Sequence, residues 1–160
     1  MVARGMITQN TENVEQGIIA FGKALDLRKR NALIDSTSDA SQMDRRWTQV
    51  QLNRAKALRA TIEGDYGAAA DLLSENRSPI NEAIGDDPND GGWKHELAAD
   101  LTWQADVMRR LDELGVARAL YQEAGQVAKK AREEYKTQQI PTTPLDQLIN
   151  RIDHAVSNSN

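Results

Sequence analysis

The chain has 160 residues, a formal net charge of −4, 39% hydrophobic residues and only 4% aromatic residues. It contains no cysteine, which excludes disulfide bonds, cysteine-ligated zinc and thiol catalysis. The mild negative charge argues against a dedicated nucleic-acid surface, and no apolar run approaches the roughly 18 residues that a membrane span needs. We therefore expect a cytoplasmic protein that binds neither nucleic acid nor membranes.

Apolar residues recur at helical spacing along most of the chain, and a composition rich in alanine favours packed helices over a β-sandwich. The periodicity of residues 1–10 is weak. A first helix is predicted over about residues 14–33, with Ile18, Phe21 and Leu25 on its apolar face. The serine-, threonine- and aspartate-rich segment 35–41 predicts a loop, because these side chains compete for helix hydrogen bonds.

A second helix is predicted over about residues 42–63, and its apolar stripe includes Trp47. Gly64 suits the left-handed position that ends many helices. A third helix should follow and end before Pro79, because proline breaks a hydrogen bond in a helix interior. Ser78 as N-cap and Pro79 as first helical residue would then start a short helix.

The stretch from residue 85 to residue 135 predicts a loop, a helix, a short turn and a second helix. The loop is dense in turn-forming residues, Asp86 to Gly92. The first helix repeats apolar residues at Trp93, Leu97, Leu101, Ala105, Met108 and Leu111, and the second at Ala117, Tyr121, Ala124, Ala128 and Ala131. Two such helices form an antiparallel hairpin, and the small residues of the second permit close packing.

The segment 140–144 contains two prolines and predicts a break. A last helix is predicted from Pro144 to about Val156, and residues 157–160 should fray. The apolar face of this helix carries Leu145, Leu148, Ile149 and Ile152.

A local pattern of small and aromatic residues recurs on the second helices of the predicted pairs. Gly17, Phe21 and Ala24 have the spacing of Ala117, Tyr121 and Ala124, and the middle copy carries Ala69, Leu73 and, less fittingly, Asn76. With the turn at Gly64-Asp65-Tyr66 and the segment Asp87-Pro88-Asn89, the sequence resembles the long-repeat bacterial type of tetratricopeptide repeat (TPR).

The resemblance implies an all-α protein, a TPR-like solenoid of antiparallel helix hairpins with a C-terminal capping helix. Residues 1–140 would hold the repeats, at about 12–34, 42–84 and 92–136, and residues 141–160 the linker and capping helix. Residues 1–10 would be the remnant of a preceding helix. We therefore expect the chain to be a fragment or repeat domain of a larger bacterial protein.

In the resembled family the first helix of each repeat lines a concave groove that binds a peptide or a partner domain. The resemblance therefore implies a non-enzymatic protein-interaction module, a scaffold or adaptor. The corresponding residues in this chain are Gln51, Arg54, Leu58, Thr102, Trp103, Asp106, Arg109 and Arg110. Trp103 has a second interpretation, in which it packs on a neighbouring repeat.

Three alternatives stay open at this point. The chain could be a structural or oligomerisation domain whose groove is filled by its own C-terminal helix. It could self-associate through exposed repeat ends at residues 1–14. It could also be a small helical enzyme or ligand-binding domain, which would require a pocket with clustered perturbed acids or histidines.

The sequence offers no catalytic, cofactor-binding or metal-binding motif. His95-Glu96 lacks the second histidine of the zinc-protease pattern, so we expect a solvated histidine there. The acidic run from Asp86 to Asp90 fails the ligand spacing of a calcium loop. Lys129, Lys130 and Arg132 are followed by two glutamates, which is typical of a solvated helix face of mixed charge.

Overall fold

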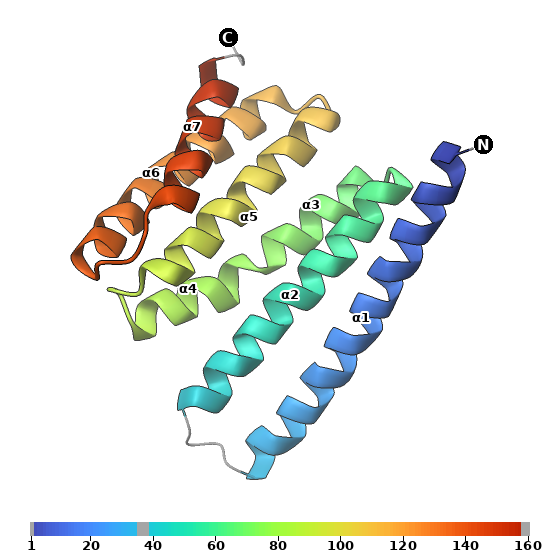
Figure 1. Cartoon of the computed structure of the whole chain (residues 1–160), viewed down its shortest axis with the longest axis horizontal. Coiled ribbons are helices and arrows are strands. Elements are labelled where there is room, and N and C mark those ends of the chain that lie inside the picture. The colour runs from blue at the N-terminus through green and yellow to red at the C-terminus, as the bar shows by residue number, and fades with distance from the viewer. Residues whose placement is uncertain (1, 35–38, 158–160) are drawn as a thin grey trace. The chain divides into compact units, whose positions relative to one another are not determined.

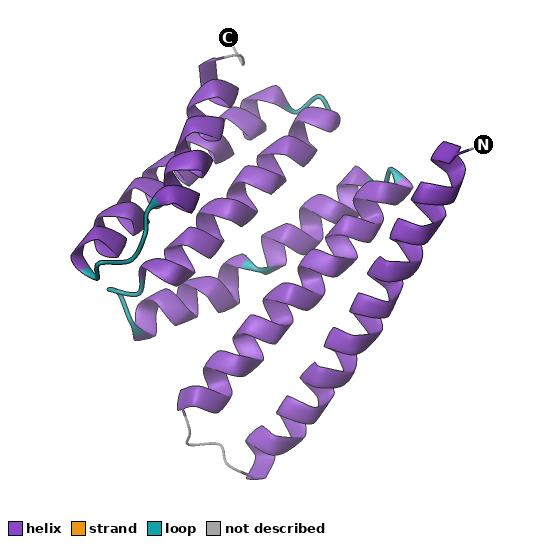
Figure 2. Cartoon of the chain, in the orientation of Figure 1, coloured by secondary structure: helices purple, strands orange, loops and turns teal. Residues whose placement is uncertain are grey.

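A computed structural model describes residues 2–34 and 39–157, and the side chains of residues 11–30 and 42–157. This part of the chain consists of helices joined by short loops, with no strand (Figure 2). The elements are labelled in Figure 1 and run α1 (Val2–Ile34), α2 (Asp39–Glu63), α3 (Tyr66–Glu75), α4 (Arg77–Asp86), α5 (Gly91–Arg110), α6 (Leu114–Thr137) and α7 (Thr143–Ser157). The all-α class is thus confirmed.

Contacts divide the chain into two compact units, Met1–Pro79 and Ile80–Asn160. In the first unit α1 packs against α2, and α2 packs against α3. In the second unit α5 packs against α6, which in turn packs against α7. Within each unit the paired helices run antiparallel, as the short connections between them require (Figure 1). The boundary between the units falls inside the predicted middle repeat, 42–84.

The helix α1 is longer than predicted. It continues without a break from Val2 to Ile34, so the expected remnant of a separate helix at residues 1–10 is wrong. The helix contains no proline, and a glycine in a helix interior costs only about 1 kcal/mol relative to alanine, so nothing in this segment forces a break. Of the predicted loop 35–41, residues 35–38 lie outside the described residues and the rest begins α2.

The position of Pro79 within its helix also differs from the predicted first position. It is the third residue of α4, which begins at Arg77 and not after an N-cap at Ser78. The first-turn position costs no hydrogen bond, because the first N–H groups of a helix have no partner within it. Asn76, which we expected to be a poor match in the repeat, is fully buried between α3 and α4 and directs its amide nitrogen at the Val50 carbonyl, 3.5 Å away.

The core of the second unit follows the predicted stripes closely. On α5, Trp93, Leu97, Leu101 and Ala105 are buried, and Leu111 just after it is exposed. The predicted small residues of α6 and Tyr121 are all buried, and α7 buries Leu145, Ile149 and Ile152. A Cβ atom at Gly125 would lie 3.4 Å from Ile152, so this glycine permits α7 to lie close against α6.

The first unit fits its predicted stripes less well. Val50 and Ala57 are buried on α2, but Trp47 is 41% exposed. On α1 Leu25 is buried and Ile18 is half-buried, whereas Phe21 is 36% exposed. The proposed equivalence of Phe21 and Tyr121 therefore does not extend to their burial.

Candidate functional site

The turn between α5 and α6 positions the cluster of side chains that stands out in the second unit. The α5 helix ends at Arg110 with Leu111 as its C-cap, and Asp112 adopts a positive φ of 63°. The amide of Glu113 then donates to the Met108 carbonyl, and that of Asp112 to the Arg109 carbonyl. This pattern is a Schellman motif, which reverses the chain so that α6 runs back along α5.

Asp106 is the centre of the cluster. One of its carboxylate oxygens accepts a hydrogen bond from the Tyr121 hydroxyl of α6, and the other accepts one from the Arg151 guanidinium of α7. Side chains from three helices therefore meet at one carboxylate. The Tyr121 ring is completely buried and the Arg151 side chain is 63% exposed, so the cluster runs from the core to the surface.

Burial raises the pKa of Tyr121 above its ordinary value, and the hydrogen bond to Asp106 raises it further. Arg109 acts in the opposite direction and lowers the pKa. The hydroxyl is consequently protonated at neutral pH and donates to Asp106. Because the buried ring has little freedom to move, this contact holds the Asp106 carboxylate in a defined position on α5.

An open hollow lies beside this cluster and is lined by Asp106, Arg109 and Arg110. The two arginines are exposed at the last turn of α5, where cations also interact favourably with the helix dipole. Trp103 lies on the same side of α5 as Asp106 and Arg110, three and seven residues before them, and is half-buried. The hollow itself presents one carboxylate and two guanidinium groups.

The predicted groove residues are therefore placed as follows. Asp106, Arg109 and Arg110 line one hollow on the second unit, and Trp103 lies about one turn before Asp106 on α5. Thr102 does not reach it, because its side chain is 1% exposed and its hydroxyl donates to the Ala98 carbonyl within α5. Gln51, Arg54 and Leu58 lie on α2 in the first unit, where Leu58 is 41% exposed.

Sequence reasoning missed the two residues that organise Asp106. Tyr121 was assigned to the core, which is correct, but its hydroxyl also forms a polar contact. Arg151 was not singled out at all. Its position, two residues after Ile149 on a helix whose apolar stripe is buried, was a signal for a side chain at the edge of the packed face.

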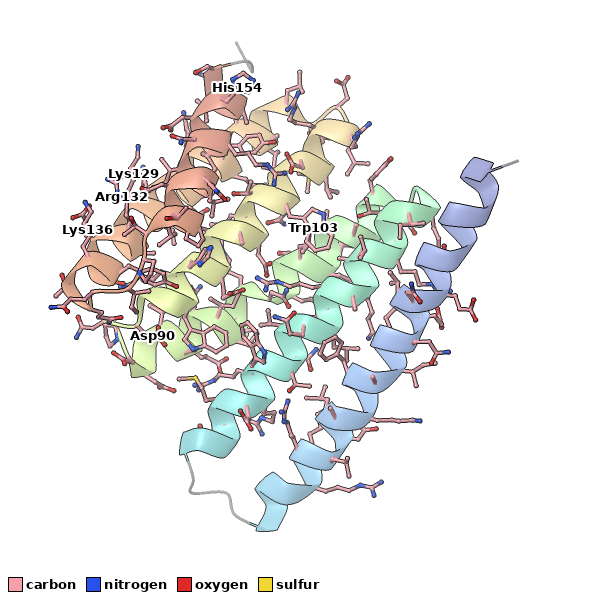
Figure 3. All side chains as sticks on the ribbon, viewed as in Figure 1. Asp90, Trp103, Lys129, Arg132, Lys136 and His154 are labelled. Atoms are coloured by element: carbon pink, nitrogen blue, oxygen red, sulfur yellow. The ribbon has the colours of Figure 1, made fainter. Side chains whose placement is uncertain are left out.

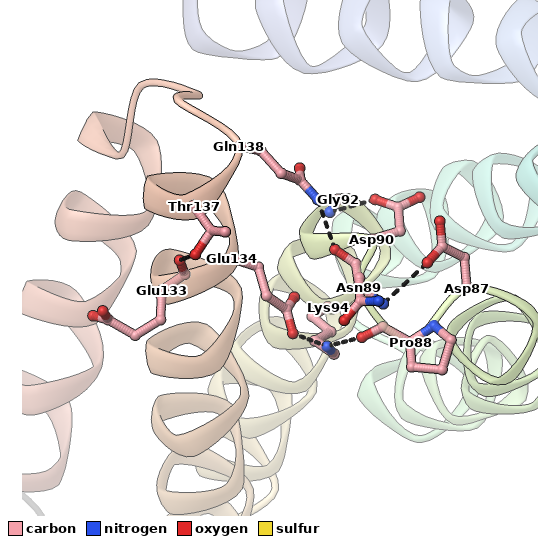
Figure 4. A network of polar contacts seen from close by, with 10 residues as sticks. All are labelled: Asp87, Pro88, Asn89, Asp90, Gly92, Lys94, Glu133, Glu134, Thr137 and Gln138. Atoms are coloured by element: carbon pink, nitrogen blue, oxygen red, sulfur yellow. Dashed lines mark hydrogen bonds and ion pairs between the residues drawn. The ribbon is translucent and has the colours of Figure 1, made fainter.

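A second polar cluster joins the loop before α5 to the end of α6 (Figure 4). Lys94 donates to the Glu134 carboxylate and to the Pro88 backbone carbonyl. The side-chain amide of Gln138 donates to the Asn89 backbone carbonyl at 2.7 Å. Two loop carboxylates also accept hydrogen bonds: Asp87 from the backbone N–H of Asn89, and Asp90 from the backbone N–H of Gly92. These contacts account for the acidic loop as turn and helix-cap chemistry.

The histidine of this region is not solvated as predicted. His95 is half-buried and packs edge-on against Tyr135, with ring centroids 6.2 Å apart. No group of three or more histidine, aspartate or glutamate side chains in the described part of the chain is placed to hold a metal ion.

The basic side chains of α6 form the predicted face of mixed charge, and Figure 3 labels three of them, Lys129, Arg132 and Lys136. Lys136 pairs with Glu133 at 2.9 Å, and Arg132 lies 3.6 Å from Asp146 of α7. The Lys136 hydrogen bond is the main cause that lowers the pKa of Glu133. These pairs neutralise part of the basic cluster.

Comparisons with protein-family models, with curated proteins and with solved structures found no match. The resemblance to TPR proteins therefore stays a prediction from sequence. No helix in the described residues combines the length and apolar character that crossing a membrane requires.

Proposed function

We propose that the chain is a non-enzymatic protein-interaction module that binds a peptide or partner domain on the α5 surface formed by Trp103, Asp106, Arg109 and Arg110. The proposal includes the TPR-like arrangement, in which such a surface belongs to a concave groove. That the protein is located in the cytoplasm stays a prediction from sequence.

The observation that carries the proposal is the fixed position of Asp106 beside two exposed arginines. A binding surface gains affinity when its polar groups are already held in place, because less freedom is lost on association. Asp106 is held by Tyr121 from α6 and by Arg151 from α7. Tryptophan and arginine are also the residue types that most often anchor protein interfaces.

The contact between Arg151 and Asp106 also favours a second candidate function. It brings α7 to the edge of the proposed surface, as expected if the C-terminal helix fills the groove of a structural domain. The Arg151→Gln variant separates the two functions. If α7 competes with the partner, this variant binds more tightly; if α7 only supports the surface, binding weakens or is unchanged.

The direct experiment is cross-linking and affinity capture with the intact chain and with the Trp103→Ala/Arg110→Ser variant. We expect the variant to lose captured partners at an unchanged melting temperature. The matched control is Arg118→Ser/Lys130→Ser, which removes exposed cations from α6 and should capture the same partners as the intact chain. Equal capture by all three proteins would contradict the proposal, and a large fall in melting temperature would assign Trp103 to the core.

A further inference from the structure

The charged side chains on the two sides of α1 differ in whether they form ion pairs with α2. On the side facing α2, Glu15 lies 2.8 Å from Arg59, and Arg28 lies 3.8 Å from Asp44. The opposite side carries Glu12, Lys23, Asp26 and Arg30, which are exposed and form no ion pair with the described residues of the first unit. Their charges are thus available for an external partner.

These residues lie along one line of the helix. Glu12, Gln16, Ile19, Lys23, Asp26 and Arg30 follow one another at alternating intervals of four and three residues. That spacing keeps side chains on a single seam, as in helices that pack along their length. Ile19 is 43% exposed on this seam and Leu27 is 59% exposed next to it, so the seam also has an apolar component.

Charge is distributed unevenly along α1. The half from residue 11 to residue 21 carries two glutamates and no basic residue. The half from residue 22 to residue 30 carries four basic residues and one aspartate. Glu15 and Arg28 are paired with α2, so the outer face keeps Glu12 in the first half, and Lys23 and Arg30 against Asp26 in the second. This face is complementary to an antiparallel copy of itself, because the glutamate of each copy then lies opposite the basic half of the other.

We propose that the outer face of α1 binds the same face of a second copy, with the two helices antiparallel. A twofold axis near Phe21 places Glu12 of one copy opposite Arg30 of the other, twice in the dimer. Ile19 then faces Lys23, whose methylene stem packs on the isoleucine while its ammonium group stays in water. This seam covers residues 12–30, not the predicted repeat ends at 1–14, which include side chains outside the described residues.

The association depends on exposed charges, so it is weak and sensitive to salt. Sedimentation equilibrium of the full chain from about 1 µM to about 500 µM should show a monomer–dimer equilibrium. Raising the ionic strength to about 1 M, where the screening length falls to about 3 Å, should shift it toward monomer. A chain that stays monomeric over the whole range at low salt overturns the proposal.

Charge reversal tests the antiparallel register. Glu12→Arg and Arg30→Glu should each weaken the homodimer about tenfold or more, because each creates two like-charge contacts. An equimolar mixture of the two variants should form a heterodimer, since the arginine introduced into one variant then faces the glutamate introduced into the other, and the second contact keeps its original residues. Lys56→Glu on α2 is the matched control, with the same change in charge as Arg30→Glu at an exposed position away from the seam.

Two results of these binding measurements would contradict the proposed antiparallel register. Homodimers of both variants with affinity within about twofold of the intact chain, or a mixture that gives no heterodimer, would contradict the register. Circular dichroism of each variant verifies the helix content. Should a charge variant fail to fold, Leu27→Ser provides a second test, since it removes an exposed apolar side chain and should weaken the dimer without reducing helix content.

Discussion

The terminal helices of the two units are covered very differently. In the second unit α7 buries Leu145, Ile149 and Ile152 against its hairpin and turns polar side chains to water. In the first unit α1 buries Leu25 alone among its described side chains, residues 11–30. The better-covered helix is the one with the more regular apolar period, and Gly125 permits it to lie close against its neighbour.

The largest expected effect comes from the two aromatic residues that sequence analysis placed in equivalent positions. Tyr121→Ala should lower the free energy of unfolding by about 3–5 kcal/mol, because it removes a completely buried ring. Phe21→Ala should cost about 1 kcal/mol or less, since the ring is already partly in water. Urea denaturation of the intact chain and the two variants measures both; equal losses would contradict the difference between the units.

The next effect concerns the close approach of α5 and α6. A Cβ atom at Gly91 would lie 2.7 Å from the Tyr135 ring and 3.1 Å from the Ala131 carbonyl oxygen. Gly91→Ala should therefore destabilise the second unit by about 1–3 kcal/mol, because the backbone oxygen cannot move aside as a side chain can. Gly115→Ala is the control: a Cβ there meets open space, so thermal unfolding of that variant should match or exceed that of the intact chain.

Tyr121, which is buried, and Tyr135, which is half-buried, predict a loss of stability at alkaline pH. Burial is the main cause that raises the pKa of both Tyr121 and Tyr135 above 10.0, and neighbouring carboxylates contribute. As the pH rises, the unfolded chain therefore releases these two protons at a lower pH than the folded chain does. The free energy of unfolding keeps the full contribution of both hydroxyl groups below pH 10 and falls as the pH rises through the raised pKa values.

Tyr121→Phe isolates the contribution of Tyr121 to this pH dependence. It should cost about 1 kcal/mol at neutral pH through the lost hydrogen bond to Asp106, and it should reduce the slope of stability against pH above 10. Denaturation midpoints between neutral pH and about pH 11 measure both quantities. An unchanged alkaline slope in this variant would show that the titrating groups lie elsewhere.

The smallest effect concerns three helix ends that share one geometry. Gly64, Asp112 and Gln139 each follow a helix with a positive φ, of 82°, 63° and 59°. Asp112→Gly and Gln139→Gly should each stabilise the chain by about 0.5–1 kcal/mol, because glycine adopts this conformation without steric cost, whereas Gly64→Ala should destabilise it by about 1 kcal/mol. Calorimetry of the three variants tests the pattern; stabilisation by Gly64→Ala would contradict it.

Much of the second unit was predictable because its residues satisfy several local rules together. Trp93 and Tyr121 lie on regular apolar stripes, and the loop before α5 is rich in turn formers. The α6 helix adds a row of small residues that specifies close packing. These local signals agree with one another, and the structure confirms the helix–turn–helix and the buried stripes that they predicted.

The first unit was harder to predict, and so was the polar cluster. Thr11, Glu12 and Asn13 offer potential cap side chains, which indicated a helix start near residue 14, whereas α1 begins at Val2. Burial of Phe21 depends on which side of α1 is covered by other helices, which periodicity alone does not give. The meeting of Asp106 with Arg151, 45 residues further along the chain, requires the three-dimensional packing of α7.

Native-state hydrogen exchange measured residue by residue tests the central claim, that α5, α6 and α7 form a closed unit while α1 is an open edge. The experiment should use a dilute sample, in which α1 is not covered by a second copy. We expect amides of residues 117–131 to exchange at least about a hundredfold more slowly than those of residues 14–28, because local opening is easier where few side chains are buried. Equal or slower exchange in residues 14–28 would contradict the account.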